Sequence, residues 1–131
     1  MKNKKVLIVS ARYYEDFSNS LELIASSLLH NKKIIYKFIK VPGVFEIPVS
    51  IAKNIKKYDG FIALGCVIKG ETPHFDFISQ ATINAIMQLS IDHKKPIGNG
   101  IITSLNGEQA LTRSKTKGGE AARAVISILS Q

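Results

Sequence analysis

The stretch Gly60-Phe-Ile-Ala-Leu-Gly-Cys-Val-Ile68 is almost continuously apolar, and a lysine and a glycine follow it at once. An apolar run of this length without polar alternation is typical of a β-strand that is buried on both faces of a parallel sheet. Three further runs have the same character, over residues 6–10, 34–41 and 97–103. The sequence therefore predicts a sheet of four parallel strands.

Segments with helical spacing lie between and after these strands. Apolar residues recur every three or four positions over 21–28, 47–55 and 78–89, and two closing helices are predicted over 108–114 and 119–129. Alternating strands and helices require right-handed crossovers, which cover both faces of a parallel sheet. Because 131 residues suffice for one hydrophobic core and not for two, we expect one α/β domain over residues 1–131, a three-layer αβα sandwich.

Composition argues against several classes of protein. The apolar runs fall far short of the roughly 20 residues that span a bilayer. The start, Met1-Lys-Asn-Lys-Lys5, leads into a predicted strand rather than into the apolar region of a signal peptide. The single cysteine, Cys66, cannot form an internal disulfide, and no metal-ligand spacing accompanies it. We therefore expect a cytoplasmic protein without a membrane partner, a disulfide or a metal site.

The formal net charge of +8 raises the question of a nucleic-acid partner. The lysines are scattered along the chain, and pairs such as Lys56-Lys57 and Lys94-Lys95 fall where helices are predicted to end. Cations at that position complement the helix dipole and remain solvated. We therefore expect no nucleic-acid partner.

The residues that follow the strands are the candidates for function, because ligands of open α/β sheets bind beyond the carboxyl ends of the strands. After the third strand, Thr72 is a suitable N-cap and Pro73 suits the first helical position, which puts His74 in the first turn of a helix. Such a helix start binds anions such as phosphate, and its positive field favours a neutral imidazole that can accept a proton. The alternative is an exposed histidine that merely follows a cap.

Other candidate residues each have a structural alternative. Glu46, in a loop fixed by two prolines, either lines a pocket or caps the second helix. Cys66 is predicted to be a packed residue rather than a nucleophile. Arg113 can clamp a phosphate with two parallel hydrogen bonds, with Lys117 nearby at a helix start, but spacing alone favours a solvated basic turn.

Three separated motifs resemble those of the 6,7-dimethyl-8-ribityllumazine synthase family: Val41-Pro-Gly-Val-Phe-Glu-Ile-Pro48, Gly65-Cys-Val-Ile-Lys-Gly-Glu-Thr-Pro-His-Phe-Asp76 and Glu108-Gln-Ala-Leu-Thr-Arg113. The resemblance implies a flavodoxin-like fold and a transferase of riboflavin biosynthesis. That enzyme condenses 5-amino-6-(D-ribitylamino)uracil with 3,4-dihydroxy-2-butanone 4-phosphate and releases water and phosphate. It needs no cofactor.

The resemblance also implies roles for individual residues. His74 would transfer protons and Arg113 would clamp the phosphate, both as catalytic residues. Substrate contacts are implied for Tyr13 against the pyrimidine ring, for Val44, Phe45 and Glu46 along the ribityl chain, and for Cys66, Val67 and Ile68 at the uracil edge. Glu71 and Thr72 would hold the phosphate through the helix start, and Asn99 and Lys117 would also bind substrate.

The chain departs from the family pattern at three places. Asn99 stands where many members have a Phe that reaches the site of a neighbouring subunit, Tyr14 stands where many have Asn, and the stretch 113–117 is shorter than the usual loop. Family members form homopentamers with sites between subunits, and some pentamers assemble into larger shells. In shell-forming members, a segment ahead of the first strand adds to the sheet of an adjacent subunit. Only five residues precede the first predicted strand here, too few for such an added strand, so we expect an isolated pentamer.

Two alternatives to the enzyme are a non-catalytic protein that binds flavin or lumazine in the same pocket and a flavodoxin-like signalling domain. The presence of both His74 and Arg113 favours the enzyme over the binding protein. A signalling domain would need an acidic cluster after the first strand and an aspartate at the end of the third. The chain has Arg12-Tyr13-Tyr14 and Ile68 at those places.

Overall fold

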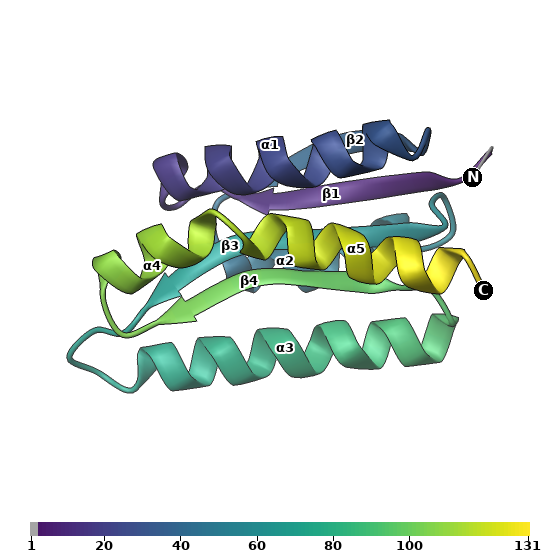
Figure 1. The fold of residues 1–131 in the computed structure, drawn as a ribbon. Coiled ribbons are helices and arrows are strands. Elements are labelled where there is room, and N and C mark those ends of the chain that lie inside the picture. The colour runs from purple at the N-terminus through teal and green to yellow at the C-terminus, as the bar shows by residue number, and fades with distance from the viewer. Residues whose placement is uncertain (1–2) are drawn as a thin grey trace.

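A computed structural model describes residues 3–131; residues 1–2, which begin the predicted domain, lie outside the described part. Strands and helices alternate along the chain (Figure 1). Their bounds are β1 (Lys5–Ala11), α1 (Glu15–Asn31), β2 (Ile35–Val41), the 3-10 turn η1 (Val44–Glu46), α2 (Ile47–Asn54), β3 (Gly60–Ile68), α3 (His74–His93), β4 (Ile97–Ser104), α4 (Gly107–Ser114) and α5 (Lys117–Leu129). The strands form one parallel sheet in the order β2-β1-β3-β4. The predicted four-stranded parallel sheet is confirmed.

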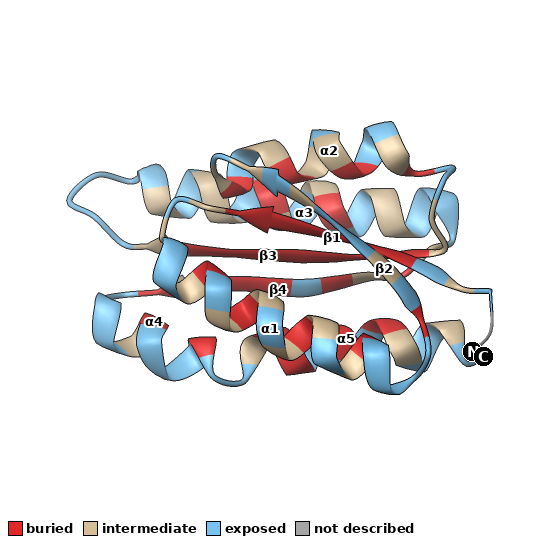
Figure 2. Ribbon diagram, turned by 90° about the horizontal axis from the view of Figure 1, so that it is seen from above, coloured by how far each residue is buried: buried red, intermediate tan, exposed pale blue. Residues whose placement is uncertain are grey.

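The helices cover both faces of the sheet, as the alternation of elements requires. Figure 2 shows α2 and α3 on one face and α1, α4 and α5 on the other. Along β1, Val6 and Ile8 belong to the core beneath α1 and α5, whereas Leu7 and Val9 belong to the core beneath α2 and α3. Both faces of β1 are therefore apolar, which explains the absence of polar alternation. The predicted three-layer α/β architecture is confirmed.

The second strand differs from the expectation that all four runs are buried on both faces. β2 lies at the edge of the sheet, and most of its residues are exposed or half-buried, with Ile35 and Phe38 among the exposed ones. Within residues 3–131, one edge of β2 pairs with no other strand. The apolar character of a strand alone does not show whether it lies at the edge or in the centre of the sheet.

Two helix starts differ slightly from the sequence prediction. α3 begins at His74 with Pro73 as its N-cap, one residue later than predicted, and Thr72 Oγ1 accepts only a long 3.4 Å hydrogen bond from the His74 N–H. α5 begins at Lys117, two residues earlier than predicted. A Cβ on Gly118 would lie 2.6 Å from the carbonyl oxygen of Leu21, so this glycine lets α5 pack directly against α1.

Candidate active site

A cavity lies at the carboxyl ends of β1 and β3, where the strand order reverses. The chain passes from β1 to β2 on one side and then to β3 on the other, and ligands of such sheets bind at this switch point. The cavity has a volume of about 580 Å³, within the usual range for small-molecule sites. We call it the switch-point pocket; it is lined by Tyr13, Tyr14, Gly43, Val44, Phe45, Glu46, Cys66, Val67, Ile68, His74 and Ile78.

Two tyrosines after β1 form the aromatic wall of the switch-point pocket. The rings of Tyr13 and Tyr14 meet edge to face, with centroids 4.9 Å apart and an angle of 81° between their planes. Tyr14 packs against the core and against Phe17, and burial raises its pKa, with smaller contributions from Tyr13 and Cys66. Its hydroxyl therefore stays protonated at neutral pH. Tyr13, in contrast, is 75% exposed and free to meet a ligand.

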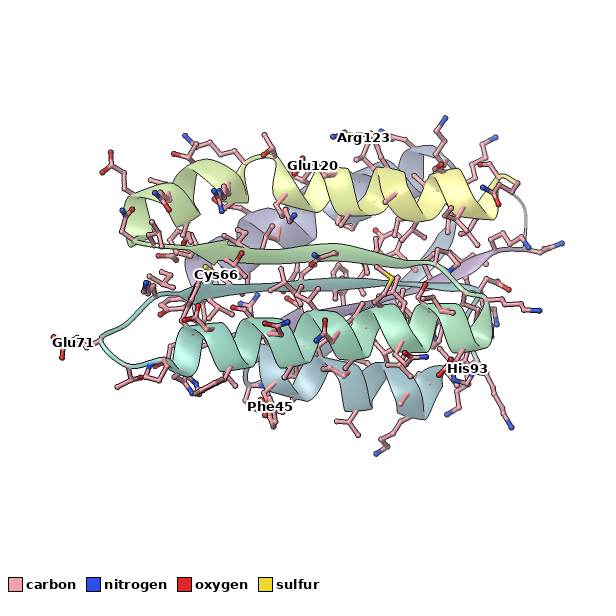
Figure 3. The ribbon with its side chains drawn as sticks, turned by 90° about the horizontal axis from the view of Figure 1, so that it is seen from below. Phe45, Cys66, Glu71, His93, Glu120 and Arg123 are labelled. Atoms are coloured by element: carbon pink, nitrogen blue, oxygen red, sulfur yellow. The ribbon has the colours of Figure 1, made fainter. Side chains whose placement is uncertain are left out.

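The turn η1 forms a second wall. The Gly43 N–H donates a 2.9 Å hydrogen bond to Glu46 Oε1, which closes the turn, so Glu46 caps this turn and also lines the pocket. Val44 is buried against β3, where a Cβ on Gly65 would lie only 2.6 Å from Val44 Cγ1. Phe45 remains 61% exposed, and Figure 3 shows it pointing outward. A glycine in β3 thus allows this wall to stand close to the sheet.

The end of β3 forms the floor of the pocket. The ladder between β1 and β3 ends at Ser10 and Leu64, whereas the ladder between β3 and β4 continues to Ile68. Backbone N–H and C=O groups on the β1 side of residues 66–68 can therefore bond to a ligand. Burial raises the pKa of Cys66 to about 11, which keeps its thiol protonated and unreactive at neutral pH.

His74 is exposed and stands at the rim of the switch-point pocket as the first residue of α3. The N–H groups of Asp76 and Phe77 bond back to the Pro73 carbonyl at 3.1 and 3.2 Å, so the first N–H groups of the helix are those best able to receive an anion. Glu71 and Thr72 lie in the exposed loop before the helix, and neither lines the pocket. In Figure 3, Glu71 points away from the helices at the far end of this loop.

Three predicted site residues lie elsewhere in the chain. Arg113 Nη1 donates a 2.6 Å hydrogen bond to the Thr103 carbonyl and lines a cavity of about 320 Å³ that Lys117 shares. Lys117 and Asn99 also line a cavity of about 520 Å³ beside β4, which Asp76 of α3 borders. The 520 Å³ cavity and the switch-point pocket thus use different residues of α3, Asp76 in the first and His74 in the second. Within one chain, Asn99, Arg113 and Lys117 do not line the switch-point pocket.

Sequence reasoning missed three residues of the pocket. Tyr14 is a departure from the family pattern, and it follows Tyr13 directly at the end of a strand. Gly43 and Ile78 lie within or next to the recognised motifs. The sequence signal for all three is their position just beyond a strand or one helical turn after His74.

The described part of the chain offers no cluster of three or more His, Cys, Asp or Glu residues that could hold a metal ion. Over residues 3–131, none of the helices combines the length and the apolar character needed to cross a membrane. Cys66 is a free, buried thiol.

Comparison with known proteins finds similarity along almost the whole chain. The family described as 6,7-dimethyl-8-ribityllumazine synthase matches residues 3–131. A protein of Agrobacterium fabrum named 6,7-dimethyl-8-ribityllumazine synthase is 43% identical over 140 aligned residues, which cover 98% of this chain and 95% of that protein. A protein of Bartonella tribocorum with the same name is 44% identical, with 98% of this chain and 89% of the relative aligned.

Proposed function

The chain belongs to the 6,7-dimethyl-8-ribityllumazine synthase family, and from this membership we propose how its switch-point pocket carries out the family's reaction. The protein is a transferase of riboflavin biosynthesis. It condenses 5-amino-6-(D-ribitylamino)uracil with 3,4-dihydroxy-2-butanone 4-phosphate to 6,7-dimethyl-8-ribityllumazine. The observation that carries the assignment of the site is the pocket at the switch point, which residues of the first two recognised motifs line together.

The pyrimidine substrate binds with its uracil edge on the backbone groups of residues 66–68. Support comes from the end of the β1 ladder at Leu64, which leaves these groups without a strand partner on one side. Tyr13 stacks on the ring, because its exposed side chain stands beside the same floor. The ribityl chain runs along η1, where the Glu46 carboxylate accepts hydrogen bonds from its hydroxyls.

His74 moves the protons of the reaction. The 5-amino group attacks the ketone and water leaves to give an imine, after which phosphate is eliminated and the ring closes with loss of water. Each of these steps transfers a proton, and His74 at the rim of the pocket is the titratable side chain best placed to do so. The raised pKa of Cys66 argues against a thiolate intermediate. The start of α3, together with the backbone N–H groups of Glu71 and Thr72 that lead into it, receives the phosphate.

A neighbouring copy completes the site in a homopentamer. Asn99, Arg113 and Lys117 lie apart from the switch-point pocket, so they can serve a reaction there only when another chain presents them. Arg113 then clamps the phosphate. The exposed apolar residues Phe77, Met87 and Ile91 along α3 support such assembly, because large apolar side chains on one helix face favour burial between subunits.

We also propose the domain organisation of the chain and its location in the cell. Residues 1–131 form one domain of this family, since β1 contributes to both cores of the same sheet. The enzyme works in the cytoplasm, where a free thiol such as that of Cys66 stays reduced.

The direct test mixes the purified protein with both substrates and follows lumazine absorbance together with the release of phosphate. We expect both signals to rise in equal amounts. Omission of either substrate is the control and should abolish both. Binding of the uracil substrate without release of phosphate would contradict the proposal and favour a non-catalytic binding protein.

A further inference from the structure

A polar cluster outside the switch-point pocket converges on a single carboxylate oxygen. Glu22 Oε2 accepts hydrogen bonds from Ser10 Oγ and from Arg12 Nη1, both at 2.6 Å. Arg12 Nη2 donates to Asn19 Oδ1 at 2.8 Å. Ser10 is fully buried, and the side chains of Arg12 and Glu22 are only 20% and 15% exposed. Solvent and salt therefore weaken this ion pair less than they weaken a surface pair.

Arg12 connects the end of β1 to the end of β2 and to α1. Its backbone N–H donates to the Val41 carbonyl at 2.9 Å, at the end of the strand that leads into η1. Its side chain holds α1 through Glu22 and Asn19. The next residue along the chain is Tyr13. The contacts of Arg12 therefore fix the point from which the aromatic wall projects.

Tyr13 has little packing of its own. It is 75% exposed, and its ring contacts the edge of the Tyr14 ring. Its orientation must then come from the backbone of the loop, and a looser loop has to be ordered when substrate binds. Such ordering weakens binding without changing the chemical step.

We propose that Glu22, which does not line the pocket, is a positioning residue: through Arg12 it fixes the loop that presents Tyr13 to the uracil substrate. The inference rests on the proposed function in one respect, the stacking of Tyr13 on the pyrimidine ring.

The first test is the variant Glu22→Gln, which keeps the size of the side chain and removes its charge. We expect the KM for the ribitylaminouracil to rise roughly 5–50-fold, because the loop is then ordered only on binding. The kcat and the KM for the butanone phosphate should each stay within about threefold of the parent values. The matched control is Glu15→Gln, the same change at an exposed position in the first turn of α1, which should leave all constants unchanged.

The second test needs no substrate. The chain contains no tryptophan, so Tyr13→Trp introduces a single reporter into the loop. Adding Glu22→Gln to this reporter protein should lower the fluorescence anisotropy and increase acrylamide quenching, whereas adding Glu15→Gln should not. If Glu22→Gln does not fold, Asn19→Ala at an exposed position removes the outer contact of Arg12 and should change the reporter in the same direction to a smaller extent.

The outcomes separate this inference from the proposed function. An unchanged reporter in both the Glu22 and Asn19 variants overturns the inference, whatever the activity does. A fall in kcat together with higher KM values for both substrates also overturns it, because that result indicates a general loss of structure. If the parent protein forms no lumazine, the proposed function fails, while a more mobile reporter in the Glu22 variant still supports the role of Glu22 in fixing the loop.

Discussion

At the scale of single residues, the position of His74 at the rim of the pocket leads to a kinetic prediction. His74→Ala should lower kcat roughly 10–1000-fold, because it removes proton transfer and leaves substrate positioning in place. The affinity for the uracil substrate should change little. Steady-state kinetics with each substrate varied in turn will check this. His93→Ala, at the opposite end of the same helix (Figure 3), is the control. Equal weakening of both substrates in His74→Ala would contradict the assignment.

A second residue-scale prediction concerns pH. The pKa of Cys66 rises from 9.0 to about 11 on folding because of burial. Between these values the folded protein keeps a proton that the unfolded chain releases, so the contribution of Cys66 to stability is complete below pH 9 and falls as pH rises towards 11. The free energy of unfolding of the parent protein should therefore fall more steeply than that of Cys66→Ala over pH 8–10.5 in urea titrations. If the free energy of unfolding falls equally with pH in the two proteins, this prediction is refuted.

At the scale of elements, Gly65 decides how closely η1 stands to the sheet. In Gly65→Ala the new Cβ would lie 2.6 Å from Val44 Cγ1 and 3.1 Å from Ala11 Cβ, so the turn must move outward. Such overpacking should cost about 1–3 kcal/mol of unfolding free energy and should also raise the KM for the uracil substrate. Gly107→Ala is the control, because a Cβ there meets no atom within 4 Å. Denaturant titration and kinetics will measure both effects. A fully stable Gly65→Ala protein with normal KM would contradict this account of η1.

The sequence predicted the elements best where both faces are buried. β3 was predicted with its observed bounds because a central strand has no polar alternation. The edge position of β2 could not be predicted, since Ile35 and Phe38 are apolar and yet exposed. α5 begins two residues before the predicted start at Gly119, because Gly118 packs closely on Leu21 inside the helix but has no apolar side chain that helical spacing could detect.

The candidate site was predictable only in part. Residues that follow β1, β2 and β3 meet in one pocket, as the rule for parallel sheets anticipates. The separation of Arg113 from His74 was not predictable from spacing, because spacing along a chain does not report distances across a sheet. For Asn99, the resemblance already implied a role in the site of a neighbouring subunit, and its distance from the switch-point pocket agrees with that expectation. The roles of all these residues stay predictions.

At the scale of the whole molecule, the separation of His74 from Arg113 leads to a test by complementation. His74→Ala and Arg113→Ala should each be roughly tenfold or more less active than the parent when alone. Unfolding and refolding them together should restore activity, because about one quarter of randomly assembled sites between neighbours then combine an intact His74 with an intact Arg113. Light scattering should give about 72 kDa, five times the chain mass of 14.4 kDa. Each variant refolded alone is the control. A fully active monomer, or no recovery after mixing, would refute the shared site.

The early end of the β1 ladder has a consequence for inhibitors. Past Leu64, the floor of the pocket offers main-chain groups, which every amino acid carries. If a pyrimidine analogue is held by these main-chain groups alone, few single amino-acid substitutions can remove its binding. Drug resistance would then arise at Tyr13 or in the turn at residues 44–46, whose side chains line the pocket. An inhibitor designed against the strand end should consequently select escape mutations only around the mouth of the pocket.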